Sequence, residues 1–369
     1  MRPTVTIIDL DAIRFNVSQV KKKVTPAEVM AVVKSNAYGH GAYEVSKVVL
    51  ESGASYLGVA LVDEGIALRK KGINAPILVF GGFFHEDVPL YLKYDLEFTL
   101  YTKSNLLALQ QIIKSSNKEV KVHIKIDTGM GRIGVPIVNA FDFVKTVAEN
   151  PGIELVGIYT HFATSDEKDK SFANLQLKEF MELNNRIAEK GIQIPYKHTA
   201  NSAAILDLPK SYLNLVRPGI MLYGYYPSRK TSESISIKPA MTLKSKVILL
   251  KKIKKSESVG YGREFIAKHD TYIATIRIGY ADGYNRLLSN RGKVKIREEI
   301  YPVVGRVCMD HVLIDLGSDT KIQVGDDVFL LAPNEGDPIH MNHLCEILQT
   351  IPYEICCRIS ERVPQLYIN

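Results

Sequence analysis

Residues 29–41 read VMAVVKSNAYGHG: five apolar residues, then a lysine, with a tyrosine and two glycines close behind. The apolar run predicts a buried β-strand, and Lys34 follows at the point where that strand should end. On its own, a lysine in this position is most often a solvated residue at the end of a strand. Whether Lys34 has another role depends on what the rest of the chain places beside it.

Seven further apolar runs follow and alternate with helical patterns. They are YLGVA (56–60), ILVF (77–80), EFTL (97–100), VKVHIKI (120–126), ELVGIYT (154–160), YKHTA (196–200) and LNLV (213–216). Continuous apolar runs are typical of parallel strands that are buried on both faces. Eight such strands with helices between them predict an α/β fold, specifically a (β/α)8 barrel of the TIM type. A helical pattern over residues 9–24 precedes the first strand.

The pattern changes near residue 240. MTLKSKVILLKKI (241–253), TYIATIRIGY (271–280), KVKIR (293–297) and YPVVGRVCMDHVLIDL (301–316) indicate strands joined by turns, and a helical pattern returns only near residues 340–351. This predicts an all-β second domain. We place the boundary in the Ser- and Lys-rich segment 227–239. The expected domains are a barrel over residues 1–232 and a mainly β-strand domain over residues 233–369.

Composition excludes several classes of protein. A chain of 369 residues with 46% hydrophobic and 24% charged residues is typical of a globular protein with two domains. The densest basic run, KKIKK (251–255), lacks interleaved aromatic residues, so we expect no nucleic-acid partner. No window has the apolar length of a membrane span, and the first residues lack the pattern of a signal peptide. The four cysteines form no paired framework, so we expect a cytoplasmic protein.

Other kinds of site are poorly supported. GMGRIG (129–134) matches GxGxxG, but the acidic residue at the required distance, Glu149, ends a helix instead of a strand. The nine histidines show no HExxH motif and no ligand spacing with cysteine, so we expect no metal. No GxSxG motif of a serine hydrolase occurs.

Polar residues follow five of the predicted strands. They are Lys34 and Tyr38 after the first, Asp127 and Arg132 after the fifth, His161 after the sixth, Asn201 and Ser202 after the seventh, and Arg217 and Gly219 after the eighth. The loops at the C-terminal ends of barrel strands carry the functional residues, so these side chains should share one rim. Small residues after the last two strands predict a phosphate site. A lysine near it could act as a point charge or form an imine with an aldehyde cofactor.

Two stretches of the second domain add candidates. ESVGYGREF (257–265) places Tyr261 between two glycines, which predicts an exposed phenol on a tight turn. GRVCMDHVLIDL (305–316) places Cys308, Met309 and Asp310 in the middle of a predicted strand.

In these motifs the sequence resembles the alanine racemases, pyridoxal-phosphate enzymes that combine an N-terminal barrel with a C-terminal β-domain. The motifs follow the family's order from Asp9 to Pro364: AVVKSNAYGHG, KIDTGMGRIG, YTHFATSD, HTANS, VRPGIMLYG, SVGYG, GYADG, GRVCMD and PYEI. Nine motifs in one order are highly specific for a family.

The resemblance implies a role for each matching residue. Lys34 would hold pyridoxal 5'-phosphate as an imine and act as one base, and Tyr261 would be the second base, reaching into the site of a partner subunit. The remaining contacts would be Tyr38, Ser202, Gly219, Ile220 and Tyr353 at the phosphate, Arg217 at the pyridine nitrogen with His161 and Asn201 nearby, and Arg132 and the Met309 backbone at the substrate carboxylate. Lys125 matches a lysine that is carbamylated in some relatives.

The implied activity is interconversion of L- and D-alanine by proton transfer at both faces of Cα, in a homodimer that supplies D-alanine for peptidoglycan. The guanidinium of Arg217 would donate to the pyridine nitrogen without protonating it. A decarboxylase of the same fold group has a carboxylate there, so Arg217 favours the racemase. The alternatives are a racemase of another small amino acid, such a decarboxylase, or a pyridoxal-phosphate carrier, which would resemble the barrel alone.

Overall fold

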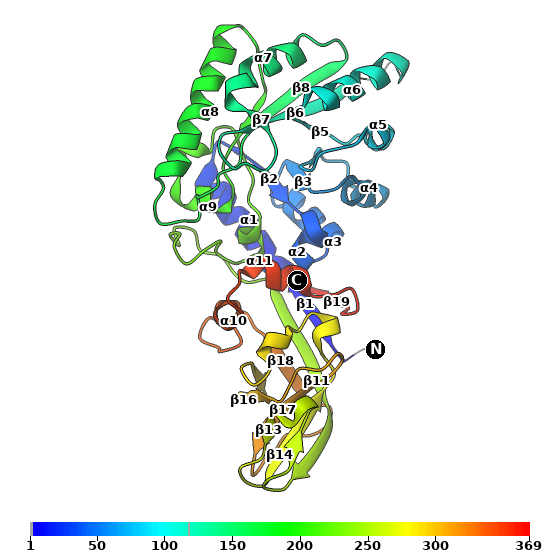
Figure 1. Ribbon diagram of the computed structural model, residues 1–369, viewed down its shortest axis with the longest axis vertical. Coiled ribbons are helices and arrows are strands. Elements are labelled where there is room, and N and C mark those ends of the chain that lie inside the picture. The colour runs from blue at the N-terminus through cyan, green and yellow to red at the C-terminus, as the bar shows by residue number, and fades with distance from the viewer. Residues whose placement is uncertain (1–2, 117–118) are drawn as a thin grey trace. The chain divides into compact units, whose positions relative to one another are not determined.

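The computed structural model describes residues 3–116 and 119–369, which form two compact units (Figure 1). The N-terminal unit comprises residues 13–237, and the C-terminal unit combines residues 238–369 with the described residues up to Ala12. The first strand, β1 (Val5–Asp9), belongs with the C-terminal unit because it pairs with β11 (Met241–Ile253) and β19 (Gln365–Ile368). The contacts therefore divide the chain after residue 237 and assign the opening strand to the second unit, in contrast to the expected division into residues 1–232 and 233–369.

The N-terminal unit contains every strand expected from the eight apolar runs. They are β2 (Glu28–Val32), β3 (Tyr56–Val59), β4 (Ile77–Val79), β5 (Phe98–Leu100), β6 (Val120–Asp127), β8 (Ile153–Tyr159), β9 (Tyr196–His198) and β10 (Leu215–Val216), with a short β7 (Val135–Pro136) beside β6. Most of their residues are buried on both faces, which is why the runs do not alternate.

These strands pair in parallel in two sheets, in the orders β10-β2-β3-β4 and β5-β6-β8-β9. Two isolated parallel bridges, Leu78 to Glu97 and Asn201 to Arg217, lie between the edges of the sheets. Side chains from five different strands meet in one cluster: Met30, Tyr56, Leu78, Tyr159 and Leu215. The core of this unit therefore lies between its strands.

Helices surround these strands (Figure 1). They are α1 (Leu10–Val24), α3 (Ala42–Glu51), α4 (Val62–Lys70), α5 (Val88–Lys93), α6 (Lys103–Ser116), α7 (Ile137–Ala148), α8 (Ser171–Glu189) and α9 (Ser202–Asp207). In α8, Leu177, Phe180, Leu183 and Ile187 are buried at helical spacing, while the residues between them are mostly exposed. Among the described residues, no helix is long and apolar enough to cross a membrane.

The C-terminal unit is built around antiparallel strands. Besides β1, β11 and β19 it has β12 (Ser258–Val259), β13 (Phe265–Ile266), β14 (Thr271–Ile276), β15 (Lys293–Ile296), β16 (Glu299–Val304), β17 (Val312–Gly317) and β18 (Asp327–Leu331), with helices α10 (Met341–Leu348) and α11 (Pro352–Arg358). The order β14-β17-β16-β15-β18-β11 closes on itself because β11 also pairs with β14. The expectation of a mixed α/β part followed by a mainly β part is confirmed.

One prediction for this unit is wrong. Cys308, Met309 and Asp310 lie in the loop between β16 and β17, and not within a strand. The strand β16 ends at Val304, and the next residue, Gly305, has a φ of 70°. The carbonyls of Cys308 and Met309 then accept hydrogen bonds from Tyr280 and Ala281, each at 3.1 Å, outside any strand ladder.

Candidate active site

Lys34 begins a short turn with an unusual backbone, α2 (Lys34–Gly39). Residues 35–38 all have a φ of 52°, a left-handed conformation. For residues with a Cβ this costs roughly 1–2 kcal/mol each, so neighbouring groups must hold the turn. Glu64 accepts the Ser35 N–H at 2.5 Å, and the Asn36 side chain accepts the Ala42 N–H at 2.8 Å. Lys34 is thereby fixed at the C-terminal end of β2.

The loops after β9 and β10 form a cradle with the tyrosine of this turn. The Gly219 N–H donates to Ser202 Oγ at 2.8 Å, which leaves the serine hydroxyl proton to donate elsewhere. A Cβ at Gly219 would lie 2.7 Å from the Tyr38 hydroxyl, so only glycine lets the backbone approach so closely. Ile220 follows, buried, at the start of a 3₁₀ turn. Two hydroxyls and a turn of backbone N–H groups therefore converge, as an anion site requires.

Arg217 is held by four hydrogen bonds. Its Nη1 donates to His198 Nδ1 at 2.9 Å and to the His198 carbonyl at 2.6 Å. Its Nη2 donates to the carbonyls of Thr160 and Thr199 at 2.7 and 3.0 Å. Burial lowers the pKa of the guanidinium to about 10, so it remains protonated at neutral pH. All four terminal N–H groups bind protein, and the Nε–H remains to donate to a ligand.

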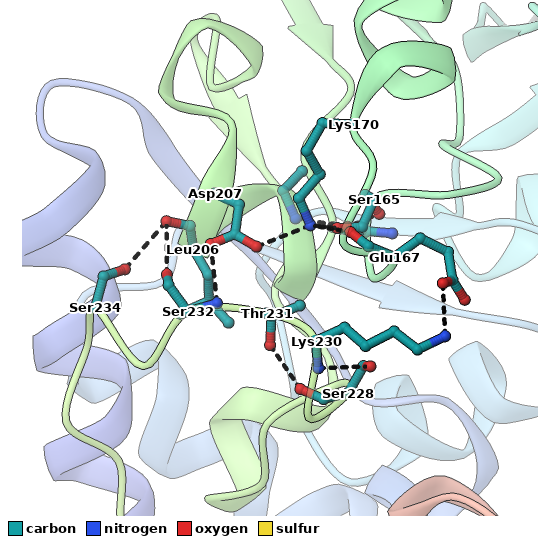
Figure 2. A network of polar contacts seen from close by, with 12 residues as sticks. Ser165, Glu167, Lys170, Leu206, Asp207, Ser228, Lys230, Thr231, Ser232 and Ser234 are labelled. Carbon is teal, nitrogen blue, oxygen red and sulfur yellow. Dashed lines mark hydrogen bonds and ion pairs between the residues drawn. The ribbon is translucent and has the colours of Figure 1, made fainter.

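Asn201 is fixed by its neighbours at the start of α9. Its Oδ1 accepts the Ala204 N–H and the Ser165 hydroxyl, each at 3.0 Å. Figure 2 shows how the Ser165 loop is held: Lys170 donates to the Ser165 carbonyl at 2.7 Å and pairs with Asp207 at 2.9 Å. The half-buried ion pair joins the loop after β8 to the end of α9, and so supports the position of Asn201.

Cations gather around the Tyr159 ring. Lys125 Nζ and the Arg217 guanidinium carbon lie 5.5 and 5.3 Å from the ring centroid. Burial, then the charges of Arg132, Arg217 and Lys34, lower the pKa of Lys125 to about 7. Arg132 itself is exposed in the loop after β6. This concentration of positive charge suits a substrate carboxylate.

His161 lies within the influence of the same charges. Burial and then the charge of Arg217 hold the pKa of His161 well below its usual value, so its imidazole is neutral at neutral pH. Its backbone carbonyl accepts a hydrogen bond from the Gln176 side chain at 3.2 Å. His161 therefore contributes a neutral polar ring to the site, and the positive charge comes from the lysines and arginines.

The other three predicted residues belong to the C-terminal unit. Tyr261 lies between Gly260 and Gly262, both with positive φ, and its side chain is 68% exposed. Met309 is 53% exposed in the loop after β16. Tyr353 is half-buried in α11. The structure thus brings together the residues predicted on the rim of the N-terminal unit and places Tyr261, Met309 and Tyr353 on the other unit.

Some supporting residues were missed from the sequence. Glu64 could have been found as the acidic residue in the first turn of α4, in VDEG. His123 and His198 interrupt the apolar strands β6 and β9, where a polar residue needs a partner. Glu97 gave no signal, because a carboxylate at the start of a strand is ordinarily solvated.

A lysine on a fixed turn, an anion cradle and an arginine with one spare donor fit a ligand that has an aldehyde, a phosphate and an aromatic nitrogen. The class that this fold and site define is that of pyridoxal-phosphate-dependent enzymes. The sequence model of the alanine racemase N-terminal domain matches residues 8–227, and that of the alanine racemase C-terminal domain matches residues 240–367. The chain belongs to the alanine racemase family.

Individual relatives agree over the whole length. The chain is 44% identical to alanine racemase 2 of Caldanaerobacter subterraneus subsp. tengcongensis, covering 100% of this chain and 95% of that protein. Its structure is similar to alanine racemase of Clostridium difficile 630 in complex with cycloserine (36% identity, TM-score 0.93, 100% and 96% of the two chains covered). It is also similar to alanine racemase of Bacillus anthracis with bound L-Ala-P (37% identity, TM-score 0.93, 100% of this chain and 96% of that chain covered). The expected family, racemase class and pyridoxal-phosphate dependence are confirmed.

Proposed function

We propose that the chain interconverts L- and D-alanine, with pyridoxal phosphate held at the C-terminal ends of β2, β9 and β10. The observation that carries this is a set of three features: the Arg217 Nε–H and the Ser202 hydroxyl, which can donate to a ligand, and the close approach of the Tyr38 hydroxyl to the Gly219 backbone. Tyr38, Ser202, Gly219, Ile220 and Tyr353 would hold the phosphate, and Asn201 and His161 would border the ring. The cofactor supplies an electron sink that makes the substrate Cα–H acidic.

The chain's own groups would then move the proton. The Lys34 amine would hold the cofactor through its aldehyde, and would exchange a proton at one face of the substrate Cα. The Tyr261 hydroxyl exchanges a proton at the other face. Arg132 and the backbone of Met309 hold the substrate carboxylate. Arg217 donates a hydrogen bond to the ring nitrogen and keeps its own proton, which limits the electron sink and suppresses side reactions.

The active molecule would be a homodimer, in which each site takes Tyr261 and Met309 from the partner subunit. Both side chains are exposed, at 68% and 53%, although one carries a catalytic role in this proposal. A partner subunit in an oligomer can cover large apolar side chains that are exposed in a single chain. The proposal extends to a cytoplasmic location and to the supply of D-alanine for peptidoglycan.

The N-terminal strands would close as a (β/α)8 barrel. The sheet β10-β2-β3-β4 ends in β10 and β4, and the sheet β5-β6-β8-β9 ends in β5 and β9. The isolated bridge Leu78–Glu97 links β4 to the start of β5, and the bridge Asn201–Arg217 links the ends of β9 and β10. Helices between successive strands agree with this topology. The expected domains, 1–232 and 233–369, would then be the barrel and the β-domain apart from the exchanged first strand.

The test is incubation of the purified holoprotein with L-alanine in heavy water, following optical activity and deuterium at Cα. We expect optical activity to fall to zero and deuterium to enter both enantiomers. Release of carbon dioxide would indicate a decarboxylase instead. A bound cofactor with no turnover of alanine or of other small amino acids would indicate a carrier protein.

A further inference from the structure

A chain of buried polar side chains leads away from Arg217 through the N-terminal unit. His198 and His123 are fully buried, and Glu97 is 4% exposed. His198 Nε2 lies 2.9 Å from His123 Nδ1, and His123 Nε2 lies 2.9 Å from Glu97 Oε2. The residues come from the end of β9, the middle of β6 and the position before β5. The chain therefore crosses the space between the strands and ends at a carboxylate.

The chemistry of the donors fixes the direction of every hydrogen bond in this chain. A guanidinium only donates, so His198 Nδ1 must accept from Arg217. The one proton of the neutral His198 ring is then on Nε2 and is donated to His123 Nδ1. His123 in turn carries its proton on Nε2 and donates it to Glu97. A second proton on either ring would set two donors against each other, so both imidazoles are neutral with the same tautomer.

The hydrogen bonds at Glu97, the last residue of this series of side chains, also have a fixed direction. The Tyr56 hydroxyl donates to the same Glu97 oxygen. Burial and the Glu97 charge raise the pKa of Tyr56, so the phenol keeps its proton and remains a donor. Two hydrogen bonds donated to one carboxyl oxygen stabilise the ionised form of that carboxylate. Within the described part of residues 13–237, Glu97 is the one acidic residue that is buried.

The positive charge of Arg217 and of its neighbours requires a compensating negative charge such as that of Glu97. Arg217 is 4% exposed, and its described hydrogen bonds go to three carbonyls and an imidazole, with no carboxylate among them. Lys125 and Arg132 add positive charge nearby. A buried cation needs compensation, and hydrogen bonds in series polarise one another in a medium of low dielectric constant.

We propose that Glu97, acting through His123 and His198, is the counter-charge of Arg217 and a positioning residue of the racemase. Its charge biases both imidazoles to accept from the arginine side, which fixes the plane of the guanidinium and hence the direction of the Nε–H. This rests on the proposed function, in which that N–H faces the pyridine nitrogen. If Glu97 had only a structural role, it would stabilise the fold without altering the electronic environment of the pyridine ring.

The first experiment needs no activity. Two-bond ¹⁵N–¹H correlation spectra of ¹⁵N-histidine holoprotein report tautomer and charge, and His123→Gln and His198→Gln assign the two signals. We expect both rings to be neutral Nε2–H tautomers at pH 7.5, and His198, whose pKa burial and the Arg217 charge lower, to remain neutral between pH 5.5 and 8.5, a range chosen around the ordinary histidine pKa of about 6.5. An Nδ1–H tautomer of either ring, or titration of His198 in this range, would overturn the proposal.

The second experiment removes the charge and keeps the shape. Glu97→Gln should lower kcat per bound cofactor by about 10- to 100-fold, by analogy with the range for residues that orient metal ligands through hydrogen bonds, and should alter the pH dependence of the cofactor's visible absorbance. Tyr56→Phe, which removes one donor to Glu97 together with a hydroxyl 3.4 Å from His123 Nε2 but keeps both imidazoles and the carboxylate, should change both in the same direction by less. Glu154→Gln, an exposed carboxylate on β8, is the matched control and should change neither.

The outcomes separate the possibilities. If both Glu97→Gln and Tyr56→Phe lower the thermal midpoint but keep wild-type kcat and absorbance, Glu97 is structural and the proposal is wrong. If Glu97→Gln does not fold, the Tyr56→Phe kinetics and the histidine spectra decide alone. A wild-type protein that racemises nothing would refute the proposed function, whereas the histidine tautomers would still test the chain from Glu97 to Arg217.

Discussion

Lys125 is a buried residue of the site, and the fold lowers the pKa of its amine. It is 4% exposed on β6, and burial with the neighbouring cations lowers its pKa from 10.5 to about 7. The unfolded chain keeps this amine protonated to near pH 10. Between pH 7 and 10 the unfolded state therefore binds more protons, and the stability of the folded state must rise with pH. Below pH 7 both states are protonated, and the full penalty of the buried charge is present.

The prediction concerns Lys125→Met. The difference in unfolding free energy between wild type and variant should change in favour of wild type by up to about 1.4 kcal/mol per pH unit between pH 7 and 9.5. Urea unfolding followed by tyrosine fluorescence measures it, since the chain has no tryptophan. Parallel curves would contradict the lowered pKa. Repeating the series with bicarbonate tests for a carbamate at Lys125, which would extend the slope below pH 7, because the carbamate carries no ammonium proton there whereas the amine of the unfolded chain does.

Tyr261 carries a prediction about handedness. Tyr261→Phe keeps the ring and removes the hydroxyl, so it should slow proton removal from one enantiomer far more than from the other, by at least about 100-fold for a positioned base. Deuterium exchange at Cα of L- and D-alanine, measured separately, checks this. Tyr280→Phe is the control, because it is also an exposed tyrosine of the C-terminal unit. Equal losses for both enantiomers with cofactor bound would argue against a face-specific base.

Single residues were predicted from the sequence where a topological rule placed them. Lys34, Ser202, Arg217 and Gly219 each follow a strand, and the rule that functional residues follow barrel strands was enough to bring them together. The series of buried side chains that leads from Arg217 to Glu97 was not predictable in this way, because strand register places His123 and Glu97 in it. Register depends on pairings between residues far apart in sequence, such as His123 with Gly157.

Among the elements, the left-handed turn α2 depends on a helix that starts 28 residues after Lys34. Glu64, in the first turn of α4, accepts three backbone N–H groups: Ser35 at 2.5 Å, Ala60 at 2.7 Å and Leu61 at 3.1 Å. Two of these cap the helix, and the third holds the strained turn. A single carboxylate therefore links the start of α4 to the position of Lys34.

We expect Glu64→Ala to lower the unfolding free energy by about 1–3 kcal/mol, the cost of a lost cap and unsatisfied donors, and to speed cofactor release. Urea unfolding and the decay of visible absorbance on dilution measure the two effects. Asp63→Ala, an exposed neighbour in the same turn, should change neither. A Glu64→Ala protein that keeps its cofactor as wild type does would show that the turn holds Lys34 without this carboxylate.

The strands could be predicted because short apolar runs bounded by turn residues are typical of buried strands in a globular chain. The error at Cys308–Asp310 has a clear cause. VCMDH (307–311) lies between two strands, β16 and β17, and its side chains are compatible with a strand, but the carbonyls of Cys308 and Met309 accept hydrogen bonds from residues 280 and 281. The left-handed turn was equally beyond prediction, since only Gly39 and Gly41 in that stretch favour a positive φ.

For the whole molecule, the division of the predicted site is the feature with the greatest consequence. Lys34 and Arg217 belong to residues 13–237, whereas Tyr261 and Met309 belong to the C-terminal unit and are exposed. In the proposed homodimer each site combines the two units from different subunits. Two inactive variants, one in each unit, can then restore activity when they share a dimer, because one of the two sites is complete.

We therefore expect complementation between Lys34→Ala and Tyr261→Phe. After mixing, unfolding and refolding in equal amounts, half of the dimers should contain one chain of each kind, and each of these has one intact site. Activity per chain should reach roughly one quarter of wild type, because the second site of the mixed dimer lacks both groups. Co-expression of the two variants with different affinity tags, followed by tandem purification, should double that value to roughly one half. A control pair, Lys34→Ala with Lys34→Arg, should regain nothing, since both changes lie in the same unit. If the mixed and purified heterodimers are as inactive as the parents, each site must take Lys34 and Tyr261 from the same chain, and the exposed Tyr261 would then need another explanation.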